Sequence, residues 1–173
     1  MAIQLYDAFV PTTRQMLQSV SKILGDAEVW AAENGKTPEE VLGARLRDDM
    51  LPLTFQIRSI VHHSRDVLAG VLSGEHDGYA AEEAGSFPES YRLLAAAVAA
   101  LDSIDRDQLE SRQGREVILI LRERRLSFTA EDFLLSYAQP NFFFHVTTAY
   151  ALLRTMGMPV GKRDYLGRLR LKP

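Results

Sequence analysis

Apolar residues recur at intervals of three, four and seven along most of the chain, which is the spacing of an amphipathic helix. With capping and stop residues as boundaries, the pattern predicts four long helices: Leu5–Asn34, an Asp48–Asp49 cap through to about Ser73, Ser86 to Leu101, and Thr129 to Met156. A short helical turn is expected at Thr37–Gly43, where a cap residue is followed by proline and glutamate. Four long helices joined by loops pack most simply as an antiparallel up-down bundle.

One stretch departs from the helical pattern. Val117–Leu121 and Leu126–Thr129 are β-prone runs on either side of the charged turn Arg122–Arg125, and they predict a small β-hairpin before the last helix. The expected fold class is therefore all-α, an antiparallel up-down four-helix bundle with one hairpin. We expect a single domain over residues 1–173, whose C-terminal part from about 158 to 173 forms a strap.

The composition is that of an ordinary globular protein, with 46% hydrophobic residues, 25% charged residues and a net charge of −3. This balance lacks the basic face that nucleic-acid binding usually requires. The absence of cysteine excludes disulfides and thiolate metal sites. The N-terminus does not resemble a signal peptide, and no apolar run reaches the ~18–20 residues of a membrane span. These features predict a cytoplasmic protein without nucleic-acid or membrane partners.

The last predicted helix is apolar nearly all round, but polar residues interrupt it at helical spacing. Asn141, His145 and Thr148 follow one another at intervals of four and three, so they share one helix face. A buried polar group without a partner costs about 1–3 kcal/mol, so these side chains need partners on a facing helix. Gln56 and His63, seven residues apart on the second predicted helix, are the expected partners. We refer to Gln56, Asn141, His145 and Thr148 as the polar stripe.

The polar stripe also has a purely structural interpretation. A buried His145 bonded to Gln56, Asn141 or a backbone carbonyl would specify how the helices dock. Thr148 is expected to bond back to its own helix rather than to act as a nucleophile. The run Phe142–Phe144 is expected in the core or at a subunit interface, because aromatic residues dominate both. A helix that is apolar nearly all round is buried or shared with another subunit, and we expect a homodimer.

Three stretches carry a resemblance to a known family. They read ARLRDDMLPLTFQ at Ala44–Gln56, PNFFFHVTTAYALLR at Pro140–Arg154 and GMPVGKRDYLG at Gly157–Gly167. Together they resemble the domain-of-unknown-function family nineteen ninety-three, an uncharacterised branch of the DinB/YfiT-like four-helix superfamily. The resemblance extends over nearly the whole chain and implies the same four-helix fold. Members of this superfamily are described as candidate metalloenzymes.

The resemblance also implies a metal site. Many members of the superfamily hold a divalent metal with three histidines, one from the second helix and two, four residues apart, from the fourth. These positions fall on Gln56, Asn141 and His145, so one histidine of the three is kept. Amides are poor ligands for Zn²⁺ or Ni²⁺, which prefer imidazole, thiolate or carboxylate. Either histidine at positions 62–63 could complete the set around His145, as could Asp49 if the register of the second helix shifts.

Three functions remain open on the sequence alone. The first is a protein with a degenerate metal site that binds a small molecule between the second and fourth helices, in a pocket lined by the polar stripe. The second is a divalent-metal-dependent enzyme of the transferase or hydrolase type. The third is a structural or stress-related interaction dimer without catalysis. Lys162 and Arg163 are interpreted as part of the strap, the alternative being a lid over an anionic ligand.

Overall fold

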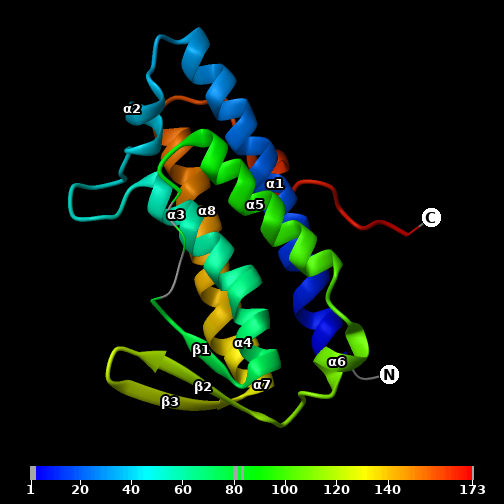
Figure 1. Cartoon of the computed structure of the whole chain (residues 1–173). Helices are drawn as coiled ribbons and strands as arrows, with labels where there is room; N and C mark the ends of the chain where they lie inside the picture. Colours follow the sequence, from blue (N-terminus) through cyan, green and yellow to red (C-terminus); the bar gives the residue numbers. More distant parts are fainter. Residues whose placement is uncertain (1–2, 80–81, 83, 173) are drawn as a thin grey trace.

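The computed structural model describes residues 3–79, 82 and 84–172 of the chain. The helices are α1 Leu5–Glu33, α2 Pro38–Leu42, α3 Leu53–Val61, α4 Val67–Ser73, α5 Phe87–Asp102, α6 Arg106–Glu110, α7 Ala130–Asp132, α8 Gln139–Thr155 and α9 Lys162–Leu166. Two π-helical segments, η1 His62–Asp66 and η2 Phe133–Ala138, connect α3 to α4 and α7 to α8. A small sheet of β1 Glu75–Asp77, β2 Glu116–Leu121 and β3 Arg124–Thr129 lies at one end of the helices (Figure 1).

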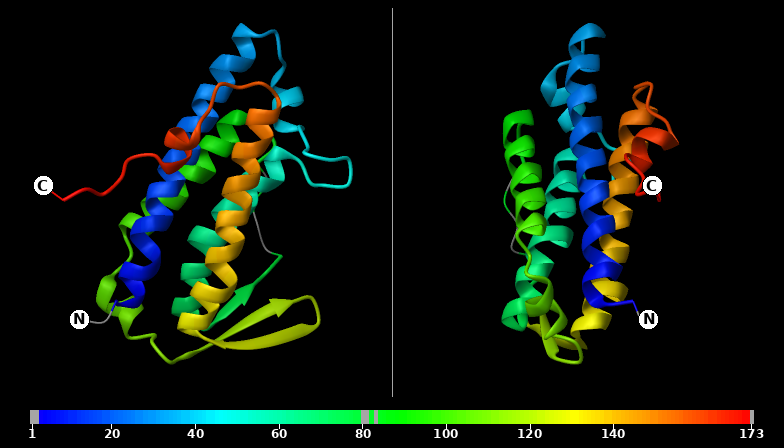
Figure 2. Two further views of the ribbon diagram at one scale, coloured as in Figure 1. Left: turned by 180° about the vertical axis from the view of Figure 1, so that it is seen from behind. Right: turned by 90° about the vertical axis from the view of Figure 1, so that its right-hand side faces the viewer.

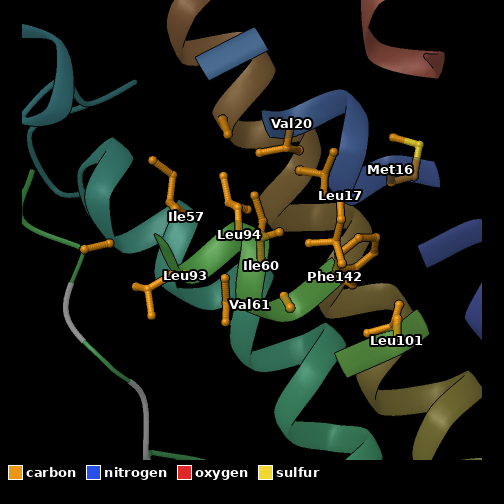
Figure 3. Packing of buried hydrophobic residues seen from close by; sticks show 14 of the residues in the cluster. Met16, Leu17, Val20, Ile57, Ile60, Val61, Leu93, Leu94, Leu101 and Phe142 are labelled. Atoms are coloured by element: carbon orange, nitrogen blue, oxygen red, sulfur yellow. The ribbon is translucent and has the colours of Figure 1, made fainter. Parts of the chain in front are cut away.

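The long helical segments pack lengthwise against one another (Figure 2). Helix α3 contacts α8 and α5, and α1 contacts the same two helices, so all four segments share one core. Figure 3 shows Leu17 of α1, Ile60 of α3, Leu94 of α5 and Phe142 of α8 pointing toward one another in this core. Full burial of each such side chain contributes about 1.5–3 kcal/mol, so apolar packing is the main force that holds the helices together. Within the described ranges, none of the helices is long and apolar enough to cross a membrane.

The second long helix begins later than the sequence predicts. It starts at Leu53 with Pro52 as its N-cap, so the aspartate cap expected at residues 48–49 is wrong. Proline disfavours the helical conformation of the residue before it, which prevents the helix from extending back through Leu51. The backbone N–H of Leu53 also donates to the carbonyl of Ala44 at 3.0 Å, which draws the intervening residues into an exposed loop.

The sheet has three strands where the sequence predicts two. Strands β2 and β3 pair antiparallel, with Ile118 opposite Ser127, and β1 pairs parallel with β2, with His76 opposite Leu119. Strand β1 has three residues and lies in a polar loop, and so short a strand leaves no recognisable alternation in the sequence. The all-α expectation is therefore corrected to a mostly helical fold with a small sheet. The sheet matters for the site because β1 turns the side chain of His76 inward.

Each π-helical segment coincides with a local feature of the sequence: η2 precedes a proline, and η1 contains two buried histidines. Segment η2 ends immediately before Gln139 and Pro140. Proline lacks an N–H and its ring clashes with the carbonyl four residues earlier, and a wider turn relieves this clash. Segment η1 contains His62 and His63, both of which are buried. Such π segments occur frequently at functional sites.

The chain after α8 packs back on α1 and α8. The hydroxyl of Ser19 on α1 donates to the backbone carbonyl of Tyr165 at 2.8 Å, and Thr147 on α8 hydrogen-bonds the Tyr165 hydroxyl at 3.0 Å. Gly167 has a φ of 61°, and a Cβ there would lie 3.2 Å from the Cβ of Ser19, so glycine is the residue that suits this close approach. These contacts hold α9 across α1.

Candidate functional site

All four histidines of the chain gather between η1, β1 and α8. His62, His63, His76 and His145 are 4%, 7%, 4% and 8% exposed, respectively. Histidine is intermediate in its tendency to be buried, so four buried imidazoles in contact are an unusual concentration of polar atoms. We call them the histidine cluster. It divides into two pairs that differ in their hydrogen bonds.

The first pair is His63 and His145. Their rings stack in parallel, with centroids 5.6 Å apart and planes within 8°. His145 Nδ1 donates to Gln56 Oε1 at 2.8 Å, because an amide oxygen can only accept, and Gln56 Nε2 donates to the backbone carbonyl of Leu51 at 3.0 Å. His63 Nδ1, in contrast, is buried and has no hydrogen-bond partner in the described part of the chain. Among the described residues, this pair therefore contains one fully buried polar atom without a hydrogen-bond partner.

The second pair is His62 and His76. Their Nε2 atoms face each other at 3.1 Å, and their ring centroids are 4.6 Å apart. His62 Nδ1 lies 3.3 Å from Asp66 Oδ2, and the carboxylate of Asp66 also accepts from Arg65 Nε at 2.6 Å. A carboxylate can only accept, so His62 donates from Nδ1 and one hydrogen is shared between the two Nε2 atoms. The pair joins η1 to β1 and is tied to a negative charge.

Burial keeps three of the imidazoles neutral at physiological pH. Loss of hydration, followed by the charges of the neighbouring histidines, lowers the pKa of His63 to about 3. Burial, followed by the charge of His62, lowers the pKa of His76 to about 4 and that of His145 to about 4. Each neutral ring offers one donor and one acceptor, so the cluster can present either function to a bound group.

Three aromatic side chains surround the His63–His145 pair. Phe55 of α3 and Phe144 of α8 contact the His145 ring edge-on, with centroids 5.9 and 5.2 Å away, and Tyr137 of η2 contacts His63 at 5.4 Å. Phe144 is 57% exposed, whereas Phe55 and Tyr137 are half-buried. We call these three residues the aromatic rim. The His63–His145 pair is therefore bordered by apolar rings, one of which, Phe144, reaches the surface.

The structure joins two members of the polar stripe by a hydrogen bond, and the other two bond to the backbone of their own helical segment. Gln56 and His145 form a direct hydrogen bond, as the structural interpretation of His145 predicts. The side-chain amide of Asn141 instead donates to the carbonyl of residue 137 at 2.7 Å, within its own helical segment. Thr148 donates to the carbonyl of residue 144 at 2.8 Å, which confirms the expectation that it bonds back to its own helix.

The sequence does not predict that His76 and Asp66 belong to the site. The carboxylate that it suggests beside the histidines is Asp49, whereas the structure places Asp66 there. Asp49 lies in the exposed loop before α3, with its side chain 75% exposed beside Arg47, so it contributes nothing to the cluster. His76 lies in a loop of ordinary composition, and its position follows only from the pairing of β1 with β2. Asp66 had a detectable signal, because it follows His62 by four residues and therefore shares its helix face.

The comparisons with known proteins agree with the resemblance inferred from the sequence. A model of the family described as Domain of unknown function (DUF1993) matches residues 5–166. The chain belongs to the DUF1993 family. Its structure is similar to a crystal structure of a DinB family member protein from Shewanella denitrificans, with a TM-score of 0.80, 25% sequence identity, and coverage of 98% of this chain and 95% of that chain. The comparison with curated proteins found no match.

The three-ligand metal site implied by the resemblance does not fit this DUF1993 protein. Two of its three positions are the amides of Gln56 and Asn141, and both amides are engaged in hydrogen bonds. Over residues 3–79, 82 and 84–172, no group of three or more histidine, cysteine, aspartate or glutamate side chains is arranged to hold a metal ion. We therefore derive no chemistry through a metal bound by Gln56, Asn141 and His145.

A small cavity in this DUF1993 protein has no residue of the polar stripe in its lining. Its volume is about 10 Å³, and apolar residues such as Leu53, Ile57 and Val146 line it between α1, α3 and α8. A space of ~10–15 Å³ accommodates about one water molecule, and this one offers hardly any polar surface.

Proposed function

We propose that this DUF1993 protein binds a small molecule at the His63–His145 pair, between the second and fourth long helical segments. The proposal assigns no reaction. The two neutral imidazoles form the polar floor of the site, and the aromatic rim supplies its apolar edge.

The observation that carries the proposal is the unsatisfied Nδ1 of His63. This atom is buried without a hydrogen-bond partner among the described residues, and such an atom costs about 1–3 kcal/mol. Its neighbour His145 is fully hydrogen-bonded at Nδ1, so the cost falls on one defined position. A ligand atom that hydrogen-bonds to His63 would remove this cost and gain affinity from it.

The rim defines the kind of molecule that suits this position. Phe144 is mostly exposed and can cover an apolar or planar group against His145, while Tyr137 lies beside His63. Burial lowers the pKa of His63 to about 3 and that of His145 to about 4, so this pair provides no cation for a strongly anionic ligand at pH 7. A planar, uncharged molecule with one hydrogen-bonding group is the class that fits best.

The test is a thermal-shift screen of uncharged heteroaromatic compounds against the tag-free protein. A ligand at 100 times its Kd adds about 2.7 kcal/mol to stability, which raises Tm by about 5–10 °C for a chain of this size. Replacement His63→Leu should abolish the shift, because it removes the unsatisfied nitrogen. The buried isosteric replacement Thr13→Val on α1 is the control and should leave the shift unchanged.

Compounds that stabilise the wild type and His63→Leu equally would place binding elsewhere and refute the proposal. The metal-dependent alternative is tested by elemental analysis of tag-free protein, with His145→Ala as the control. Near-stoichiometric Zn or Ni that disappears in His145→Ala would replace the small-molecule proposal with the metalloenzyme.

The third alternative, an interaction dimer without a ligand, is tested by light scattering. The homodimer and the cytoplasmic location remain proposals that rest on the sequence. If no compound shifts Tm, and if replacements in the cluster alter stability without altering the mass of the assembly, the cluster acts in packing alone.

A further inference from the structure

The His62–His76 pair has the geometry of two ligands of one ion. Its two Nε2 atoms are 3.1 Å apart. Two imidazole nitrogens on one tetrahedral Zn²⁺, each 2.0–2.1 Å from the metal, are about 3.3 Å apart, and a right-angled arrangement brings them to about 2.9 Å. The observed separation lies between these values, so an ion can be accommodated with little movement of either ring.

The surroundings of His62 match those of a metal ligand as well. Histidine ligands usually donate their other ring N–H to a carboxylate or carbonyl, which fixes the ring and increases its basicity. His62 Nδ1 faces Asp66 Oδ2 at 3.3 Å, and Asp66 is in turn held by Arg65 Nε at 2.6 Å. The carboxylate would also offset part of the charge of a divalent ion.

The position of His76 is set by the backbone on both sides. The pairing of β1 with β2 places it opposite Leu119. On the other side, a Cβ on Gly70 of α4 would lie 2.7 Å from the Cβ of His76, so glycine is needed for the strand to approach the helix this closely. A ligand held by the backbone in this way is preorganised, which lowers the entropic cost of binding.

We propose that His62 and His76 bind one divalent transition-metal ion through their Nε2 atoms, with Asp66 orienting His62. The ion replaces the hydrogen that the two nitrogens share, and His76 then carries its proton on Nδ1. Solvent or a small ligand fills the remaining positions, since the described residues offer no group of three protein donors. The site uses none of Gln56, Asn141 and His145, and it does not depend on the function proposed above.

The test is a titration of tag-free, chelator-treated protein with Zn²⁺ by calorimetry. We expect one ion per chain with a micromolar Kd. Replacement of either ligand, His62→Gln or His76→Gln, should weaken binding at least tenfold, and Asp66→Asn should weaken it by about tenfold through loss of the carboxylate behind His62. The matched control His145→Gln, also in the cluster, should change the Kd less than twofold.

Two outcomes would overturn the proposal. One is the absence of Zn²⁺ binding up to millimolar concentration, and the other is binding that survives His76→Gln but is lost in His145→Gln. Electron paramagnetic resonance of the wild type loaded with Cu²⁺ counts the coordinated imidazole nitrogens without any variant. Two nitrogens support the proposal and any other number contradicts it, so the test holds even if a replacement prevents folding.

Discussion

The two histidine pairs lie side by side, yet their polar atoms are satisfied in different ways. His62 and His76 share one hydrogen and are tied to the carboxylate of Asp66. His63 and His145 stack without a carboxylate, and one fully buried nitrogen of this pair, His63 Nδ1, has no partner in the described structure. The same residue type, at similar burial, is thus suited to an ion in one pair and to an uncharged ligand in the other. The two pairs differ in the partner of one Nδ1 atom: His62 Nδ1 faces the carboxylate of Asp66, whereas His63 Nδ1 has no partner among the described residues.

Lowering the pH should have the largest effect on the free energy of unfolding, because it protonates histidines of both pairs. Folded-state pKa values of about 3 for His63 and about 4 for His76 and His145 lie below the unfolded value of about 6.5, so the unfolded chain binds more protons. The stability that these three neutral histidines contribute is fully present above pH 6.5 and is lost as the pH falls toward 4. The loss is roughly 3 kcal/mol per histidine at pH 4.

Urea unfolding at pH 7, 5.5 and 4 measures this loss. The variant His145→Gln should show a smaller pH dependence than the wild type, because one of the three shifted groups is gone. An unfolding free energy that stays constant from pH 7 to pH 4 would contradict the prediction.

Breaking the hydrogen bond in the first pair should have the next largest effect. His145→Leu leaves Gln56 Oε1 without its donor, and an unsatisfied buried acceptor costs about 1–3 kcal/mol. Urea unfolding at pH 7 should show this destabilisation. The double replacement His145→Leu with Gln56→Leu should recover most of it, since both polar partners are then removed together.

Moving the strand that carries His76 should disturb the second pair alone. Gly70→Ala places a Cβ 2.7 Å from the Cβ of His76 and should cost about 1–3 kcal/mol through overpacking. Thermal unfolding measures the cost, and the same variant should bind Zn²⁺ more weakly. Gly25→Ala in the middle of α1 is the control, because nothing lies within 4 Å of its added Cβ, and it should stabilise the helix by about 0.5–1 kcal/mol.

The smallest predicted change in the free energy of unfolding is an increase, whereas the replacements in the cluster and at Gly70 described above decrease it. His63→Leu removes the unsatisfied nitrogen and leaves an apolar side chain of similar size, so stability at pH 7 should rise by about 1 kcal/mol. A chemical denaturation curve that shows a loss of stability instead would mean that His63 Nδ1 is satisfied by an ordered water. Stabilisation in His63→Leu together with loss of ligand binding would separate the function of the site from its contribution to folding.

Much of the fold could be predicted from local sequence signals. The capping box at Thr37 and the N-cap at Ser86 occur as expected, because the side-chain oxygens that cap a helix are recognisable from their spacing. The sequence predicts too early a start for the second helix because an aspartate pair resembles a cap, whereas Pro52 is the N-cap in the structure. Strand β1 could not be predicted, since three residues contain too little pattern.

Helical periodicity was sufficient to predict the helical segments and the contact of Gln56 with His145, because residues three, four and seven apart lie on one helix face. Three sequence motifs were sufficient to predict the family. That all four histidines meet and divide into two pairs follows only from the folded chain. His76 reaches the cluster because β1 pairs with β2, which places it opposite Leu119, more than forty residues later in the chain. It also packs closely against Gly70, which lies on a different element, α4. Contacts of this kind leave no periodic trace in the sequence, so only the folded chain reveals them.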